Sequence, residues 1–143
     1  MSVSVDASVL VYASNTADPV HAPARALIER LAAGPEIVYL FWPTLMAYLR
    51  LVTHPGILAQ PLTAAEATAN VGALLSRPHV RTPGEEEGFW GLYRATAGDY
   101  ARANEVPDAH LATLMRQHGV RTIYTRDRHF RRFEGIDVRD PFS

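Results

Sequence analysis

Three aspartates that are far apart in the chain each stand beside a predicted strand. Asp6 ends the β-branched run 3–5, Asp127 follows the apolar segment 120–125, and Asp108 begins the helix that precedes this segment. Functional side chains in open parallel sheets gather at the carboxyl ends of the strands, which meet at one edge. We therefore expect the carboxylates of Asp6, Asp108 and Asp127 to converge.

Carboxylates that converge repel one another, and either a proton or a bound cation must relieve the repulsion. Hard oxygen ligands favour Mg²⁺ or Mn²⁺. A cation of this kind can activate water near neutral pH and neutralise charge on a phosphate under attack. The predicted chemistry is hydrolysis of a phosphodiester bond. Asp108 alone, beside Pro107, is better explained as a helix-capping residue, so the prediction depends on all three acids together.

The elements that must position these acids are separated by proline and glycine. We expect strands at residues 3–5, 37–42, 80–82, 120–125 and 137–139, and a short helical turn at 128–133. Helical periodicity indicates helices over 20–33, from Pro43 to about 52, behind a capping box at 63–66, over 85–103 and over 107–119. Strands that alternate with helices predict an α/β fold with a mostly parallel central sheet flanked by helices on both faces.

Two helix starts have their own signals. Ser8 can cap a helical turn that begins at Val9, and Glu85 to Glu87 fall in the first turn of the helix expected over 85–103. Acidic side chains there suit the positive end of the helix dipole.

We find no linker, repeat or low-complexity tract, so residues 1–143 are expected to form one domain.

The composition excludes several classes of protein. There is no cysteine, so disulfides, a thiol nucleophile and thiolate zinc sites are absent. The apolar fraction is 48% and the charged fraction is 20%, as in a folded globular domain. The first residues lack the basic segment of a signal peptide, and no apolar run reaches the roughly 18 residues of a membrane span. We expect a cytoplasmic protein that does not contact membranes.

Four segments resemble a known family. The stretches VSVDASVLVYA, VPDAHLATLMRQHG and TIYTRDRHFRRF resemble the first, third and fourth acidic motifs of the PIN-domain family, and WPTLMAYLRLVTHPGI looks like a VapC-type toxin. Together the segments extend from residue 3 to residue 133, which is nearly the whole length of the chain. The resemblance implies a PIN-like domain and a Mg²⁺- or Mn²⁺-dependent endoribonuclease, the toxic component of a type II, VapBC-like toxin–antitoxin system. It also implies an RNA substrate, transfer RNA and ribosomal RNA being candidates, inhibition by a cognate antitoxin, and a homodimer.

The resemblance also assigns residues. Asp6, Asp108 and Asp127 match the metal-binding, catalytic acids of the family, and Ser8 and Thr125 match polar residues that steady them.

Asn104 stands where such toxins often carry a polar residue near the site. It could equally end a preceding helix as a C-cap.

The chain departs from the family pattern at two positions. Ala47 occupies the place of a glutamate that is common in the second motif, and His129 stands where an aspartate is common. The site then has only three protein carboxylates, which we favour, or another acid such as Glu105 or one of Glu85 to Glu87 reaches in. The alternative function is a catalytically weakened PIN-fold protein that binds RNA or an antitoxin. A receiver-like signalling module is disfavoured because the chain has no lysine.

Arginine provides all 14 basic residues, and the formal net charge is −1. Arg126 and Arg128 flank Asp127, where guanidinium groups could bind RNA phosphate or acidic groups of an antitoxin. Arg50, in the second motif, either contacts RNA or pairs with a nearby acid.

Overall fold

The computed structural model describes all 143 residues. Its centre is a five-stranded sheet in the order β3-β2-β1-β4-β5, in which every neighbouring pair is parallel. The strands are β1 (Ser2–Val5), β2 (Ile37–Tyr39), β3 (Val80–Arg81), β4 (Thr122–Tyr124) and β5 (Asp137–Arg139). Every predicted strand is present, and most are shorter than the sequence indicated. The prediction of a parallel sheet is confirmed.

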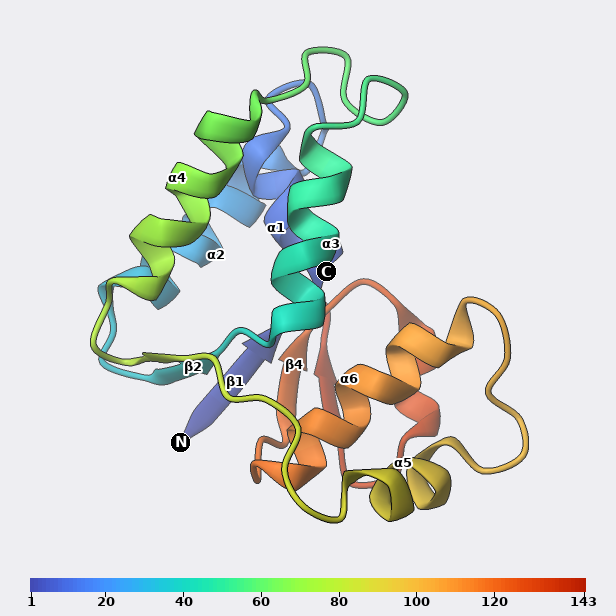
Figure 1. The fold of residues 1–143 in the computed structure, drawn as a ribbon. Coiled ribbons are helices and arrows are strands. Elements are labelled where there is room, and N and C mark those ends of the chain that lie inside the picture. The colour runs from blue at the N-terminus through green and yellow to red at the C-terminus, as the bar shows by residue number, and fades with distance from the viewer.

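Six helices and one 3-10 turn surround the sheet. They are α1 (Ala7–Ser14), α2 (His21–Ala33), α3 (Trp42–Val52), α4 (Ala64–Leu75), α5 (Phe89–Ala97), α6 (Glu105–Gln117) and the turn η1 (Arg128–Arg132). Helices α1 to α4 gather in one part of the molecule, and α5 and α6 lie together in another (Figure 1). None of these helices has the length and apolar character needed to cross a membrane.

The two helix groups cover opposite faces of the sheet. Val3 and Val5 of β1 belong to an apolar cluster shared with α1 to α4. Ile123 of β4 belongs to a second cluster, which includes α6 residues. Ile123 pairs in register with Ser4, and successive side chains of a strand point to opposite faces, so Ile123 faces away from Val3 and Val5. The predicted α/β fold with helices on both faces is confirmed.

The prediction of a helix beginning at Glu85 is wrong. Helix α5 begins at Phe89, after Gly88 in the left-handed region at φ 83°, and ends at Ala97. The acidic stretch 85–87 lies in the preceding loop, where α6 holds it. Gln117 accepts a hydrogen bond from the Glu86 N–H at 2.9 Å and donates to the Glu86 carbonyl at 3.1 Å.

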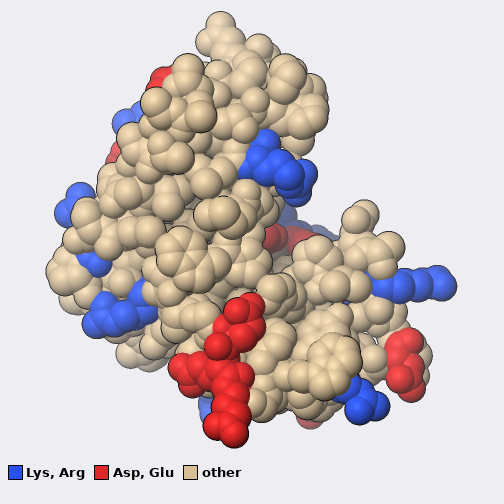
Figure 2. Space-filling view, viewed as in Figure 1, with Lys and Arg blue, Asp and Glu red and all other residues tan.

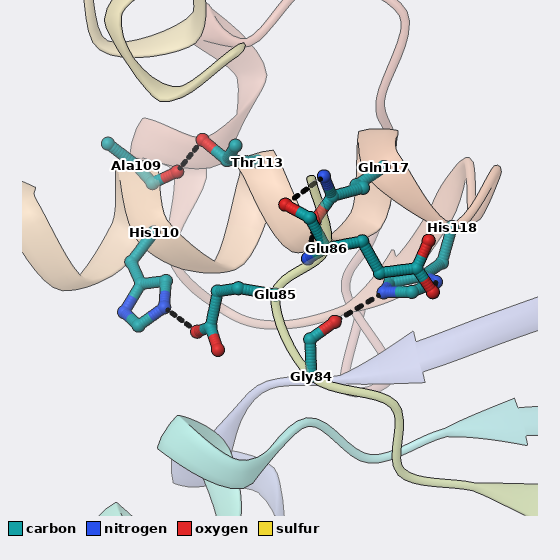
Figure 3. A network of polar contacts seen from close by, with 8 residues as sticks. All are labelled: Gly84, Glu85, Glu86, Ala109, His110, Thr113, Gln117 and His118. Atoms are coloured by element: carbon teal, nitrogen blue, oxygen red, sulfur yellow. Dashed lines mark hydrogen bonds and ion pairs between the residues drawn. The ribbon is translucent and has the colours of Figure 1, made fainter. Parts of the chain in front are cut away.

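Two histidines complete the attachment of this loop to α6. The His118 ring bonds to the Gly84 carbonyl at 2.8 Å, and His110 Nε2 lies 2.6 Å from Glu85 Oε1 (Figure 3). Contacts with another helix, rather than the dipole of their own helix, therefore hold these glutamates in place.

The expected capping by Ser8 is also wrong. The N-cap of α1 is Asp6, which has extended backbone angles, and Ser8 is the second residue of the helix. The strand thus passes into the helix two residues earlier than a cap at Ser8 would allow, and Asp6 stands at the junction.

The capping box of α4 is confirmed, and it generates a prediction. Thr63 Oγ1 accepts from the Glu66 N–H, and Glu66 Oε1 accepts from the Thr63 N–H. Thr63→Ala should lower the free energy of unfolding by about 1 kcal/mol, because a backbone donor loses its partner. Denaturant unfolding measures this change. Thr68→Ala is the matched control, since its hydroxyl only bonds back to helix carbonyls, and an equal loss there would contradict the assignment.

Candidate active site

Asp6 is held at the carboxyl end of the central strand β1 by both its backbone and its side chain. Its N–H donates to the Tyr124 carbonyl of β4 at 3.0 Å. Its Oδ2 accepts hydrogen bonds from Thr125 Oγ1 at 2.7 Å and from Ser8 Oγ at 3.2 Å. These bonds fix the orientation of the carboxylate and leave Oδ1 without a protein donor.

Thr125 joins Asp6 to Asp127. Its hydroxyl donates to Asp6 and accepts from the Asp127 N–H at 3.0 Å, and the residue is 1% exposed. Asp127 caps η1, because its Oδ1 accepts from the His129 N–H at 2.9 Å. The hydroxyl of Thr125 thus ties together the ends of β1 and β4.

Asp108 lies in the first turn of α6 and is electrostatically coupled to both other acids. Burial, followed by the negative charges of Asp127 and Asp6, raises the pKa of Asp108 to about 6. The positive charges of Arg132 and His129 act in the opposite direction. The charges of Asp6 and Asp127 therefore act on Asp108 at this edge of the sheet, whereas a metal site shared by the three acids stays a prediction.

The oxygen donors of the three acids meet some of the needs of a divalent cation. No group of three or more carboxylate or imidazole side chains is arranged to hold a metal ion as it stands. Mg²⁺, however, keeps several water ligands and often uses only one or two protein carboxylates. A cluster of oxygen donors whose mutual repulsion raises a carboxyl pKa fits such a cation in its chemistry.

The surface above α3 and α6 is hollowed. Figure 2 shows acidic atoms on the floor of a hollow between these helices and basic atoms along its α3 side. Arg50, in the last turn of α3, is the one basic residue of that helix and makes no ion pair. The expected alternative, in which Arg50 pairs with an acid, is therefore wrong. A separate cavity of about 380 Å³ lies among α1 to α4, and none of the three acids lines it.

The two arginines that flank Asp127 differ. The Arg126 guanidinium lies over two aromatic rings, 5.6 Å from the centroid of Tyr12 and 5.5 Å from that of Phe142. Arg128 is exposed at the start of η1. Aromatic contacts therefore occupy Arg126, whereas Arg128 is open to a partner.

Asn104 does not end a helix. Helix α5 ends at Ala97, and Asn104 is an exposed residue in the N-cap position of α6 without a capping hydrogen bond from its side chain. The C-cap interpretation is therefore wrong. Its expected role beside Asp108 stays a prediction.

Two of the acids that could replace the missing glutamate already have partners. Glu105 Oε2 lies 3.1 Å from Arg132 Nη1, and Glu85 pairs with His110. His129, in the position of the second missing acid, has Nδ1 3.2 Å from Asp127 Oδ1. The pair of Glu105 with Arg132 is a long-range contact, and the pair of His129 with Asp127 is a local one. No motif in the sequence predicts either pair.

Fold and site together define an α/β protein with three coupled carboxylates at the carboxyl edge of a parallel sheet. The chain belongs to the PIN domain family, whose model matches residues 3–136.

Comparison with curated proteins places it near the VapC-type members of this family. It is 53% identical over 144 residues to "Ribonuclease VapC48" of Mycobacterium tuberculosis, covering 100% of this chain and 99% of that protein. It is 35% identical over 140 residues to "Ribonuclease VapC43" of the same species, covering 97% and 95%.

Solved structures agree with this fold. The crystal structure of Mycobacterium tuberculosis VapC20, described as a sarcin–ricin loop cleaving toxin, has a TM-score of 0.70 at 22% identity and covers 96% of this chain and 99% of that one. VapBC2 from Rickettsia felis, bound to a promoter DNA fragment, has a TM-score of 0.68 at 14% identity, with 97% and 98% covered.

The raised pKa of Asp108 predicts a pH-dependent stability difference. Folding raises this pKa from 3.8 to about 6, so the folded state binds the proton more tightly, and stability falls as pH rises through that window. Asp108→Asn cannot ionise. In metal-free buffer its melting temperature should exceed that of the wild type at about pH 8, and the difference should shrink at about pH 4.5.

Thermal unfolding in EDTA measures both differences, with Asp99→Asn on an exposed loop as the control. A difference that does not change with pH would contradict the raised pKa of Asp108.

Proposed function

We propose that this protein is a Mg²⁺- or Mn²⁺-dependent endoribonuclease, the toxic component of a type II, VapBC-like system, and that a cognate antitoxin inhibits it. The observation that carries the proposal is the hydrogen-bonded chain Asp6–Thr125–Asp127 beside the half-buried Asp108. Three hard oxygen donors on rigid elements suit phosphodiester hydrolysis assisted by a divalent cation.

Each residue then has a defined task. Asp6, Asp108 and Asp127 would hold the cation, which when bound supplies positive charge against the phosphate and lowers the pKa of the attacking water. Thr125 and Ser8 hold Oδ2 of Asp6, so that its Oδ1 is free of protein donors. The cap of η1 fixes Oδ1 of Asp127 in the same way.

Three further residues are proposed to bind RNA or to lie at the edge of the site. Arg50 and Arg128, both exposed, bind RNA phosphates in this proposal, and Asn104 lies at the start of the helix that carries Asp108. Arg126 is the weakest of the RNA-binding candidates, because its guanidinium already lies over Tyr12 and Phe142.

Relatives support the reaction and the partner. VapC48 and VapC43, which align over nearly the whole chain, carry the name ribonuclease. In this proposal the enzyme is cytoplasmic, acts on transfer RNA or ribosomal RNA and pairs with an antitoxin, and the fold shared with VapBC2 supports the last point. The exposed side chains of Trp42 and Met46 on α3, 45% and 50% accessible, agree with a homodimer.

The second candidate function is a PIN-fold regulatory protein that binds RNA or an antitoxin with little turnover. The observation that favours it is Ala47, since neither Glu105 nor Glu85 is free to replace a glutamate there. Measurement of RNA cleavage separates the two functions.

Substitution of the acids tests catalysis. Asp6→Asn and Asp127→Asn should each lower the rate of RNA cleavage by at least about 100-fold, the order lost when one preorganised electrostatic group is removed. Sequencing of RNA fragments produced with Mg²⁺, Mn²⁺ or EDTA measures cleavage and identifies the target.

The matched control is Asp99→Asn, which makes the same change on an exposed loop and should cleave like the wild type. Cleavage by Asp6→Asn at the wild-type rate would contradict the proposed site. An inactive wild type that still binds RNA would favour the regulatory function instead.

Thr125 gives a separate prediction about metal binding. Thr125→Val keeps the shape of the side chain but removes the hydroxyl that joins Asp6 to Asp127, so Mn²⁺ affinity should fall about 10- to 100-fold. Thr125→Ser keeps the hydroxyl and should lose far less. Isothermal titration calorimetry with Mn²⁺ measures both affinities, and equal affinities for the two variants would count against the bridging role.

A further inference from the structure

Arg132, the last residue of η1, is fixed on two sides. Its Nη1 lies 3.1 Å from Glu105 Oε2 at the start of α6, and its guanidinium lies 4.7 Å from the centroid of the Phe133 ring. Phe133 is 4% exposed and is part of the second apolar cluster. The guanidinium is therefore held by a carboxylate and by a rigid, buried ring.

This guanidinium is close to the acid cluster. Glu105 precedes Asp108 by three residues in α6, so the two side chains lie on the same face of the helix. Arg132 belongs to the same short turn that Asp127 caps. Its positive charge also opposes the rise in the pKa of Asp108. These facts place a fixed positive charge near Asp108.

Arg132 keeps donors available for an anion. The ion pair with Glu105 occupies one edge of the guanidinium, which carries five N–H donors in a planar fork. Its side chain is 34% exposed, so solvent, and hence a ligand, reaches it. Arg126, by contrast, lies over two aromatic rings on the other flank of Asp127.

We propose that Arg132 binds a phosphate of the RNA next to the acid cluster, and that Glu105 and Phe133 hold its guanidinium in the geometry for this contact. The proposal rests on the proposed ribonuclease function and adds a residue to it. A guanidinium that is already ordered loses little conformational freedom on binding, and its fork matches two phosphate oxygens. Glu105 is then a positioning residue, which explains why it is not free to act as a metal ligand.

RNA binding gives the first test. In an Asp6→Asn background, Arg132→Ala should weaken the binding of a fluorescent mixed-sequence RNA by about tenfold. The slope of log affinity against log salt concentration should become shallower by about 0.7 to 0.9, the change for one lost phosphate contact. Fluorescence anisotropy over a salt series measures both.

Arg131→Ala is the matched control, because it removes the same charge from the neighbouring exposed position, which makes no ion pair. Arg132→Lys keeps the charge and the aliphatic stem over Phe133, so it tests the contact if the alanine variant is poorly folded. It should recover part of the affinity. Equal effects of Arg131→Ala and Arg132→Ala on affinity and salt slope would overturn the proposal.

Glu105→Gln tests the positioning role through steady-state kinetics. Removal of a negative charge near the RNA should leave KM unchanged or lower it, whereas a guanidinium that is no longer held should lower kcat several-fold. A purely structural ion pair would show no such split, and an unchanged kcat would overturn the assignment of Glu105.

Failure of the proposed function has a different signature. If the wild type does not cleave RNA with any divalent cation, the ribonuclease proposal fails, and the anisotropy series still reports whether Arg132 contacts phosphate. If the wild type cleaves and Arg132→Ala behaves like Arg131→Ala, only the inference about Arg132 fails.

Discussion

Repulsion among three carboxylates is the interaction around which this structure is arranged. Each acid is stabilised by a different device: Asp6 by two hydroxyl donors, Asp127 by a backbone N–H of the turn that it caps, and Asp108 by its place in the first turn of a helix. The pKa of Asp108 is still raised to about 6, first by burial and then by the charges of Asp127 and Asp6, so these devices do not remove the repulsion fully. A proton or a cation must neutralise the negative charge that remains, and this requirement makes the cluster suitable for metal-assisted chemistry.

The parallel topology explains why acids that are far apart in the chain meet. Strand β1 lies between β2 and β4, so the ends of β1 and β4 are neighbours, and the Asp6 N–H bonds directly to the Tyr124 carbonyl. Helix α6 leads back to the start of β4, and its N-terminus therefore lies at the carboxyl edge of the sheet. One topological rule thus places all three acids.

The sequence predicted the elements that depend on local chemistry and missed those that depend on long-range contacts. β-branched runs and the Thr63 capping box indicated strands and helix starts that the structure contains. The charge of the glutamates at 85–87 suits a helix dipole and predicts a helix there. Gly88 and the hydrogen bonds from Gln117 and His118 determine their position instead, and a partner some 30 residues away leaves no periodic signal.

The contacts within the site were also only partly predictable from the sequence. The positions of Asp6, Asp108 and Asp127 follow from strand ends, whereas the double role of the Thr125 hydroxyl requires knowledge of both of its partners. The pair formed by Glu105 and Arg132 was invisible for the same reason, although the spacing of Glu105 and Asp108 did place them on one helix face.

Ala47, which stands in place of a glutamate, reduces the number of carboxylates available to the proposed site. With Glu105 paired to Arg132 and Glu85 to His110, neither is free to add a fourth carboxylate to the proposed site. Fewer protein ligands leave more of the coordination sphere of Mg²⁺ to water and phosphate oxygens, which this ion accepts readily. If RNA phosphate supplies those oxygens, RNA and cation must strengthen each other's binding by the same factor. The missing carboxylate then weakens the hold on the free ion and makes retention of the ion depend on bound RNA, which is compatible with catalysis.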